Sequence, residues 1–213
     1  MTEVEMWSAA ARAEVTCAAL VKHGFDAVFV QTKEEAADLV MKFIKPGMKI
    51  GFGGSMTIMA LGIQGKAEAA GAVLLDHNRP GITPGERVEV MRSQLTCDVF
   101  VSSSNAVTMK GEILNIDGNG NRVAALTFGP RKTVVVMGAN KIAVDEKEAW
   151  DRIEAWASPM NNKRLARENP CVKAGQCMDC QNPGRICRVY QVLRRKPFPS
   201  DFTVIIVGEN LGY

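Results

Sequence analysis

The sequence is poor in histidine and in aromatic residues: two of its 213 residues are histidines, and 6% are aromatic. No apolar run approaches the roughly 18 residues of a membrane-spanning helix. The first residues, Met1–Met6, also lack the basic start and the apolar run of a signal peptide. We therefore expect a cytoplasmic protein without a membrane span.

A strong excess of charge is also missing from most of the chain. The net charge of +3 is too small to indicate nucleic-acid binding. The segment Lys163–Lys196 has nine Lys or Arg against two acidic residues, a net charge of +7, which leaves −4 for the rest of the chain. The basic character therefore belongs to this one segment.

Short apolar runs alternate with longer stretches of helical period, a pattern typical of an α/β fold with a largely parallel sheet. The length is sufficient for one core, so we expect a single domain over residues 1–213, with a Cys-rich basic insertion at about 159–199 before the last strand. The predicted strands are Ala27–Val30, Lys49–Phe52, Ala72–Leu75, Val99–Ser102, Thr133–Met137 and Thr203–Val207.

The stretch Asn105–Ile116 interrupts this alternation. It has the pattern of a β-hairpin that turns at Met109–Gly111. Such a hairpin would either extend the sheet or cover the edge at which ligands bind. Farther along, Thr83–Glu86 has the sequence of a capping box with proline at the first helical position, which predicts a helix start.

The turn Gly51–Thr57 places three glycines and a serine between a predicted strand and a predicted helix. In open α/β sheets, ligands bind outside the carboxyl ends of strands, where helix N-termini have free N–H groups. Glycine leaves no Cβ between backbone and ligand, so Gly53, Gly54 and Ser55 are candidates for binding a phosphate or carboxylate. The alternative is a tight turn without a ligand. The dinucleotide, phosphate-loop and hydrolase-elbow motifs do not fit these residues.

A second glycine turn, Asp117–Arg122, also leads into a helical pattern. Its consecutive N–H groups could form an anion-binding nest, and Arg122 could add a bidentate clamp. The alternative is a surface turn rich in Asn and Asp. Lys141 follows another predicted strand, where it would either neutralise an anionic substrate or lie in solvent.

Four cysteines cluster within the basic insertion: Cys171, Cys177, Cys180 and Cys187. A Cys-x2-Cys pair with two further cysteines nearby is typical of a four-thiolate site for zinc or an iron–sulfur cluster. Free thiols or disulfides are the alternatives. Cys17 and Cys97 lie in apolar stretches and are expected to be core thiols.

Neither histidine has the spacing of a metal ligand. His23 precedes Gly24 and is expected to end the first helix. His77 follows a predicted strand, where it would either reach the ligand edge as an acid or base or remain a solvated loop residue.

Several of these motifs together resemble the lactate-utilization protein C family, the LUD domain, over most of the chain. The stretches that carry the resemblance are Gly51–Thr57, Ser103–Thr108, Gly111–Ala125, Phe128–Pro130, Gly138–Lys141 and Val207–Gly212.

The resemblance implies a three-layer α/β/α fold with a mostly parallel sheet, similar to ribose-phosphate isomerases and coenzyme A transferases. It implies a role in oxidation of L-lactate or a related 2-hydroxy acid to pyruvate or its equivalent, in a system whose partner subunits carry iron–sulfur clusters. The motif positions that it marks as candidates for binding a small anionic ligand are Gly53, Gly54, Ser55, Asn105, Asp117, Asn121, Arg122 and Lys141.

Two other functions stay open from the sequence. One is a non-catalytic subunit of a redox complex, whose basic insertion docks an iron–sulfur partner. The other is an isomerase or transferase acting on a sugar phosphate or an acyl thioester, for which Glu112 is the only candidate nucleophile. Catalytic residues, the ligand and the oligomeric state are left open, and a homo-oligomer is one alternative.

Overall fold

Six parallel strands form the central sheet in the computed structural model, which describes residues 1–213. Their order across the sheet is β1-β10-β7-β4-β2-β3, and every neighbouring pair is parallel. All six predicted strands are present, so the prediction of a largely parallel sheet is confirmed. The strands are β1 (Asp26–Val30), β2 (Lys49–Phe52), β3 (Val73–Leu75), β4 (Val99–Ser102), β7 (Lys132–Gly138) and β10 (Asp201–Val207).

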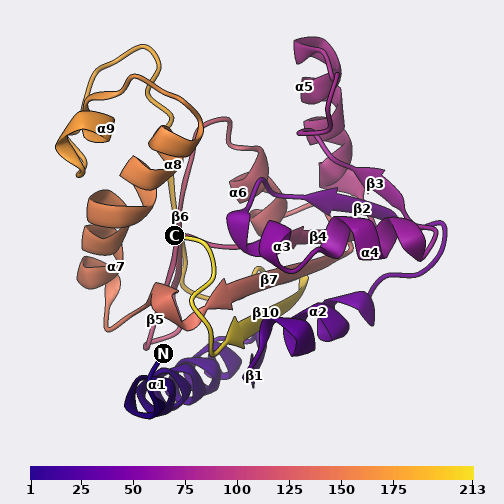
Figure 1. Cartoon of the computed structure of the whole chain (residues 1–213). Coiled ribbons are helices and arrows are strands. Elements are labelled where there is room, and N and C mark those ends of the chain that lie inside the picture. The colour runs from indigo at the N-terminus through magenta and orange to yellow at the C-terminus, as the bar shows by residue number, and fades with distance from the viewer.

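Helices cover both faces of this sheet, which gives the predicted three layers (Figure 1). None of the helices combines the length and the apolar character that a membrane crossing requires. The helices are α1 (Glu3–Lys22), α2 (Lys33–Met41), α3 (Met56–Ala60), α4 (Ile63–Ala69), α5 (Pro84–Ser93), α6 (Asn121–Thr127), α7 (Glu146–Arg152), α8 (Ser158–Arg164) and α9 (Pro170–Ala174).

The strands are apolar on both sides because each side faces a separate core. In β7, Val134 and Val136 pack with α2, α3 and α4, whereas Val135 and Met137 pack with α1 and α6. Successive side chains of a strand point to opposite faces, so a continuous apolar run serves both cores. The central strands are therefore rigid supports for whatever follows their carboxyl ends.

The hairpin does not extend the central sheet but belongs to a second, four-stranded sheet. Its strands β5 (Ala106–Thr108) and β6 (Ile113–Asp117) are antiparallel, and β6 also pairs with β9 (Val189–Leu193). The fourth strand, β8 (Ile142–Ala143), pairs with β5. This sheet packs on the core that contains α1 and carries α7 on its other side. The expected insertion thus contributes a strand, β9, to the fold.

Capping residues fix several helix starts. Thr2, Thr32 and Thr83 each form a capping box, in which the hydroxyl accepts a backbone N–H and a glutamate three residues later accepts the N–H of the threonine. The box predicted at Thr83 is confirmed. Helix α5, which it starts, projects from the sheet, and only Met91 of this helix is buried (Figure 1).

Candidate functional site

A cavity of about 270 Å³ lies at the carboxyl ends of the parallel strands. The turn after β6 borders it on one side, and the end of α7–α8 and the C-terminal residues close other sides. The two glycine turns therefore border one cavity. The residues that follow strands of the central sheet and line it are Gly54–Thr57, His77, Asn78, Ser103–Asn105, Lys141 and Gly212–Tyr213.

The first glycine turn supplies free backbone donors to this cavity. Ser55 caps α3 through a hydrogen bond from the N–H of Ile58. No acceptor in the chain takes the N–H groups of Gly54, Ser55, Met56 or Thr57. Four consecutive amides thus stay available at the cavity wall, as the turn predicts.

Gly53 lies behind this wall and does not line the cavity. Its N–H donates to the carbonyl of Val101, and a Cβ there would clash with the side chain of Ser102 and crowd that of Arg122. Glycine is thus required at this position by packing. The expectation that Gly53 offers its amide to a ligand is wrong.

The second glycine turn does not present a free nest, because Asp117 fills it. The carboxylate of Asp117 accepts the N–H groups of Gly118, Arg122 and Val123 at 2.8, 3.1 and 3.2 Å. An anion from outside would have to displace this carboxylate. Asp117 and Asn121 line the cavity, but the nest prediction is wrong for these three amides.

Arg122 braces the cavity floor. Its Nη1 donates to the carbonyl of Ser103 and to the side chain of Asn115, and its Nη2 donates to the side chain of Asn105 and the carbonyl of Ile116. These four bonds use both terminal nitrogens, so a bidentate clamp on a ligand, as expected from the sequence, is not available. Asn105 is held in turn, because its side-chain oxygen also accepts the N–H of Ile116. Arg122 therefore contributes a positive charge to the cavity, while the hydrogen-bond donors on its terminal nitrogens are already used within the chain.

Lys141 is buried rather than solvated, with 3% of its surface exposed. Its Nζ lies 3.0 Å from the hydroxyls of Thr57 and Ser103 and 3.3 Å from the carbonyl of Ser104. Burial, together with the nearby charges of Arg152 and Arg122, lowers the pKa of Lys141 to about 7. The expectation of a solvated loop lysine is wrong.

Lys141 is buried, whereas Arg122 and Arg152 are half-buried. Of these three cations only Arg122 has a nearby carboxylate, that of Asp117, whose charge partly offsets the effect of burial on the pKa of Arg122. Arg152 donates to the carbonyls of Asn140 and Asn105, and burial lowers its pKa to about 10. None of the ion pairs of the structure involves Lys141, Arg122 or Arg152. Charges that are withdrawn from water without a counter-charge are costly, and this excess of positive charge beside the cavity favours an anionic ligand.

The outer wall of the cavity adds three more arginines, Arg87, Arg164 and Arg167. Asp117 is the only acidic residue in the lining, and its carboxylate is already bonded within the turn. The cavity therefore favours negatively charged molecules over neutral or positive ones.

Two hydroxyl groups at the cavity have no partner. The hydroxyl oxygens of Ser104 and Tyr213 are buried without a hydrogen bond, and both residues line the cavity. Burial raises the pKa of Tyr213, and nearby Arg164 opposes the rise. Buried polar groups are rarely left unpaired, so these hydroxyls are candidates for ligand contacts.

His77 also faces the cavity and is buried, so the expectation of a solvated loop histidine is wrong. Its Nδ1 lies 3.0 Å from the side-chain nitrogen of Gln94, and its Nε2 lies 3.3 Å from that of Asn78. Burial lowers the pKa of His77 below its ordinary value, which favours the neutral imidazole near pH 7.

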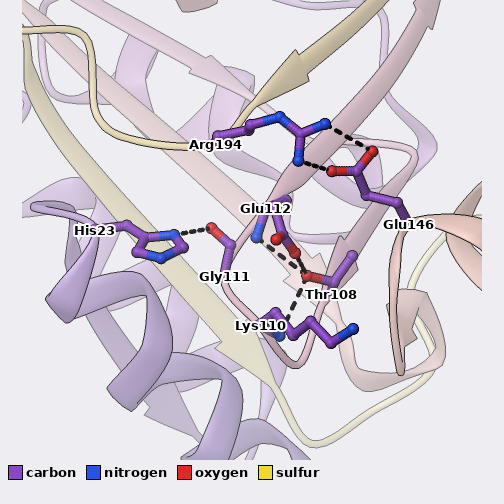
Figure 2. Close-up of polar contacts among 7 residues, drawn as sticks. All are labelled: His23, Thr108, Lys110, Gly111, Glu112, Glu146 and Arg194. Carbon is purple, nitrogen blue, oxygen red and sulfur yellow. Dashed lines mark hydrogen bonds and ion pairs between the residues drawn. The ribbon is translucent and has the colours of Figure 1, made fainter.

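Glu112 lies away from the cavity, at the hairpin (Figure 2). Its carboxylate accepts from the hydroxyl of Thr108 within the turn. On the other side of the hairpin, the imidazole of His23, which ends α1 as predicted, contacts the carbonyl of Gly111 at 3.0 Å. No glutamate lines the cavity, so the choice of Glu112 as a nucleophile at the ligand site is wrong.

All six cysteines are free thiols. Cys17 and Cys97 are core thiols as expected, and burial raises the pKa of each to about 11. The other four line a second cavity of about 20 Å³. As they stand, no three His, Cys, Asp or Glu side chains are arranged to hold a metal ion. The cysteines of the second cavity are Cys171, Cys177, Cys180 and Cys187.

Several cavity residues were missed by the sequence analysis. Ser103 and Ser104 directly follow a predicted strand, so the rule that selected Lys141 would have found them. Arg167 and Tyr213 carry no such signal, because they approach the cavity from segments whose position depends on tertiary packing.

A crystal structure of a DUF162 family protein from Deinococcus radiodurans is similar to this fold: 12% identity, a TM-score of 0.53, and coverage of 93% of this chain and 98% of that one. That likeness supports the α/β/α architecture. A crystal structure of eIF2B beta from Chaetomium thermophilum is similar over 54% of this chain and 44% of that one, with 14% identity and a TM-score of 0.38. No curated protein matches the sequence. The model of the LUD domain matches residues 13–207, so the chain belongs to the LUD domain family.

Proposed function

We propose that this LUD domain protein takes part in the use of L-lactate, by binding a 2-hydroxy acid through its carboxylate in the cavity at the strand ends. The observation that carries the proposal is the group of three cations, the buried Lys141 and the half-buried Arg122 and Arg152, none of which forms an ion pair with a carboxylate. A bound carboxylate would supply the missing negative charge. The free N–H groups of Gly54–Thr57 can donate hydrogen bonds to the same carboxylate.

The size of the cavity agrees with a small ligand. At about 270 Å³ it is slightly smaller than the pockets that hold drug-sized molecules. The unpaired hydroxyls of Ser104 and Tyr213 offer hydrogen bonds to the hydroxyl or carboxylate of a 2-hydroxy acid.

Oxidation of L-lactate to pyruvate removes two electrons and two protons. We assign to His77, which is neutral near pH 7, the acceptance of the hydroxyl proton. The C2 hydrogen leaves with the two electrons as a hydride, for which the proposal requires a two-electron acceptor of the flavin or nicotinamide class, since an iron–sulfur cluster accepts single electrons. By family resemblance, iron–sulfur partner subunits would ultimately take these electrons.

Calorimetric titration of the purified protein tests the binding step. We expect L-lactate to bind and Arg167→Gln to weaken that binding several-fold, since Arg167 lines the cavity. Lys163→Gln is the matched control, because it removes a nearby exposed positive charge that does not line the cavity. Binding of inorganic phosphate without any binding of L-lactate or another 2-hydroxy acid would contradict the proposal.

A second candidate function is that of a docking subunit for an iron–sulfur partner. The basic segment favours it, since Lys163, Lys173, Arg188 and Arg195 are all exposed. Such a surface would attract an acidic partner in a salt-dependent way. We expect the protein to co-purify with an iron–sulfur protein from the native host at low salt. A variant with these four charges neutralised should lose this partner. Co-purification that changes neither with salt nor in the variant would exclude this surface.

A further inference from the structure

The segment Ser158–Arg188 is folded with very little apolar burial. Between residues 160 and 188, only Asn162, Asn169 and Cys171 are buried, and two of these side chains are polar. Asn169 donates to Asn162 and to the carbonyl of Gly184, which holds the start of α9 to the loop that follows. A core of this size does not by itself account for an ordered segment.

Four thiols converge inside this segment. Cys171, Cys177, Cys180 and Cys187 come from α9 and the loop after it, and all four line the same small cavity. The segment has no apolar core that would otherwise explain why these four cysteines lie together.

The local backbone has features of a metal-binding knuckle. In the Cys177–Cys180 turn, the N–H of Asp179 points to the sulfur of Cys177 at 3.4 Å, and Asp179 has a φ of 39°. Left-handed backbone at a residue other than glycine is uncommon and marks a constrained turn. An N–H group directed at sulfur stabilises a thiolate.

Arg185 ties the two cysteine loops together. Its guanidinium donates to the carbonyls of Cys180 and Cys187, each at 2.7 Å, and to the carboxylate of Asp179 at 2.8 Å. It therefore fixes the backbone of both loops and places a positive charge beside the thiols. Four thiolates around a divalent ion carry a net charge of −2, which Arg185 and neighbouring Arg188 offset.

We propose that Cys171, Cys177, Cys180 and Cys187 bind one divalent metal ion of the zinc type, in tetrahedral coordination. The cavity of about 20 Å³ is close to the space of one water molecule, which suits a single ion and not a cluster of four irons and four sulfides. The thiols lose their protons on binding, and the ion draws the four sulfurs to ligand distance. Metal binding of this kind is coupled to the folding of the segment.

The proposed site also supports the wall of the larger cavity. Ser158, Ile186 and Cys187 line both cavities. Removal of the ion would therefore loosen the side of the cavity that carries Arg164 and Arg167. The metal site itself rests on the cysteines alone and does not depend on the proposed function.

Metal analysis of untagged protein, purified with and without oxygen, tests the site directly. We expect one zinc per chain, loss of zinc and a lower thermal midpoint after chelation, and recovery of both on addition of Zn²⁺. Co²⁺ added to the stripped protein should give the intense visible bands of a tetrahedral thiolate site. These measurements on the unaltered chain do not depend on whether a cysteine variant folds.

Variants sharpen the test. Cys180→Ser should lower the zinc content to a small fraction of one per chain, whereas Cys17→Ala, at a core thiol remote from the segment, should leave it unchanged. Iron with sulfide, or four thiols that react freely with a thiol reagent in protein purified with zinc present, would overturn the proposal. Loss of L-lactate binding with full zinc content would count against the proposed function and not against the metal site.

Discussion

Two arginines of this protein each bond to four neighbouring groups, Arg122 beside the larger cavity and Arg185 beside the smaller one. Arg122 connects the end of β4, the start of β5 and the strand β6, through acceptors up to 19 residues away in sequence. Arg185 connects three groups of its own loop and the hydroxyl of Tyr190 in β9, all at most six residues away. The first therefore joins elements of the main fold, while the second orders a local segment.

The wall of the larger cavity at the strand ends and the wall formed by Ser158–Arg188 also differ in what supports them. The wall at the strand ends rests on two apolar cores of 17 buried residues each. The wall from Ser158–Arg188 has almost no apolar support and depends on polar contacts and, we propose, on a metal ion. Local opening should therefore occur on the second wall at a lower free energy than on the first.

The largest expected effect comes from Arg122→Ala. The variant leaves the buried side chain of Asn115 without this donor and removes the other three contacts, so the free energy of unfolding should fall by about 3 kcal/mol or more. Arg185→Ala is the matched comparison and should change the global value by less than about 1 kcal/mol, because its contacts are local and partly exposed. Urea unfolding measures both; equal losses would contradict the difference between the two walls.

A second prediction concerns pH. An anion that pairs with Lys141 binds the ammonium form, and the pKa of this group is lowered to about 7 in the free protein. Affinity should thus be nearly constant below pH 7 and should fall by up to about tenfold per pH unit above it, until the pKa of the bound form is reached. Burial lowers the pKa of His77 from 6.5, so protonation of His77 changes the affinity only at acidic pH.

The variant Lys141→Met removes the amino group on which this pH dependence of binding rests. Titration calorimetry of L-lactate between pH 6 and 9 should show that this variant binds weakly and without the decline above pH 7. Proton uptake on binding, measured in buffers of different ionisation enthalpy, should also disappear. The same decline in the variant would show that another group controls binding.

The smallest effect is expected from single arginines on the outer wall. Arg164→Gln should weaken anion binding by about 1 kcal/mol or less, since the side chain is solvent-exposed and its charge is screened by salt. The loss should shrink further when salt is raised. A loss as large as that of Lys141→Met would show that the outer wall, and not the buried cations, carries the binding energy.

Much of the fold follows from local pattern. The six runs that read as strands are the six strands of the central sheet. The inner strands are almost wholly apolar because both of their faces are buried, whereas the edge strands β1 and β3 are partly exposed. The capping box at Thr83 starts α5 for the equally local reason that its two side-chain bonds lie within four residues.

The site was less predictable, and the errors have one cause. Lys141 and His77 look like loop residues in sequence but are buried, because segments distant in the chain close over them. The Asp117–Arg122 turn has the sequence of an anion nest, but the carboxylate at its own start fills it. Whether a hydrogen-bond donor stays free for a ligand depends on tertiary contacts, and the spacing of residues in the sequence does not reveal them.

The sequence by itself determined the parallel α/β sheet, the glycine turn at the end of β2 and the four closely spaced cysteines, since each depends on residues near one another in the chain. Only the tertiary structure decided that Lys141, Arg122 and Arg152 lie together without forming an ion pair to a carboxylate, and that the cysteines surround one small cavity. The physical reason is that charge and desolvation act through space. A buried cation is defined by what surrounds it, and those neighbours come from strands and loops far apart in sequence.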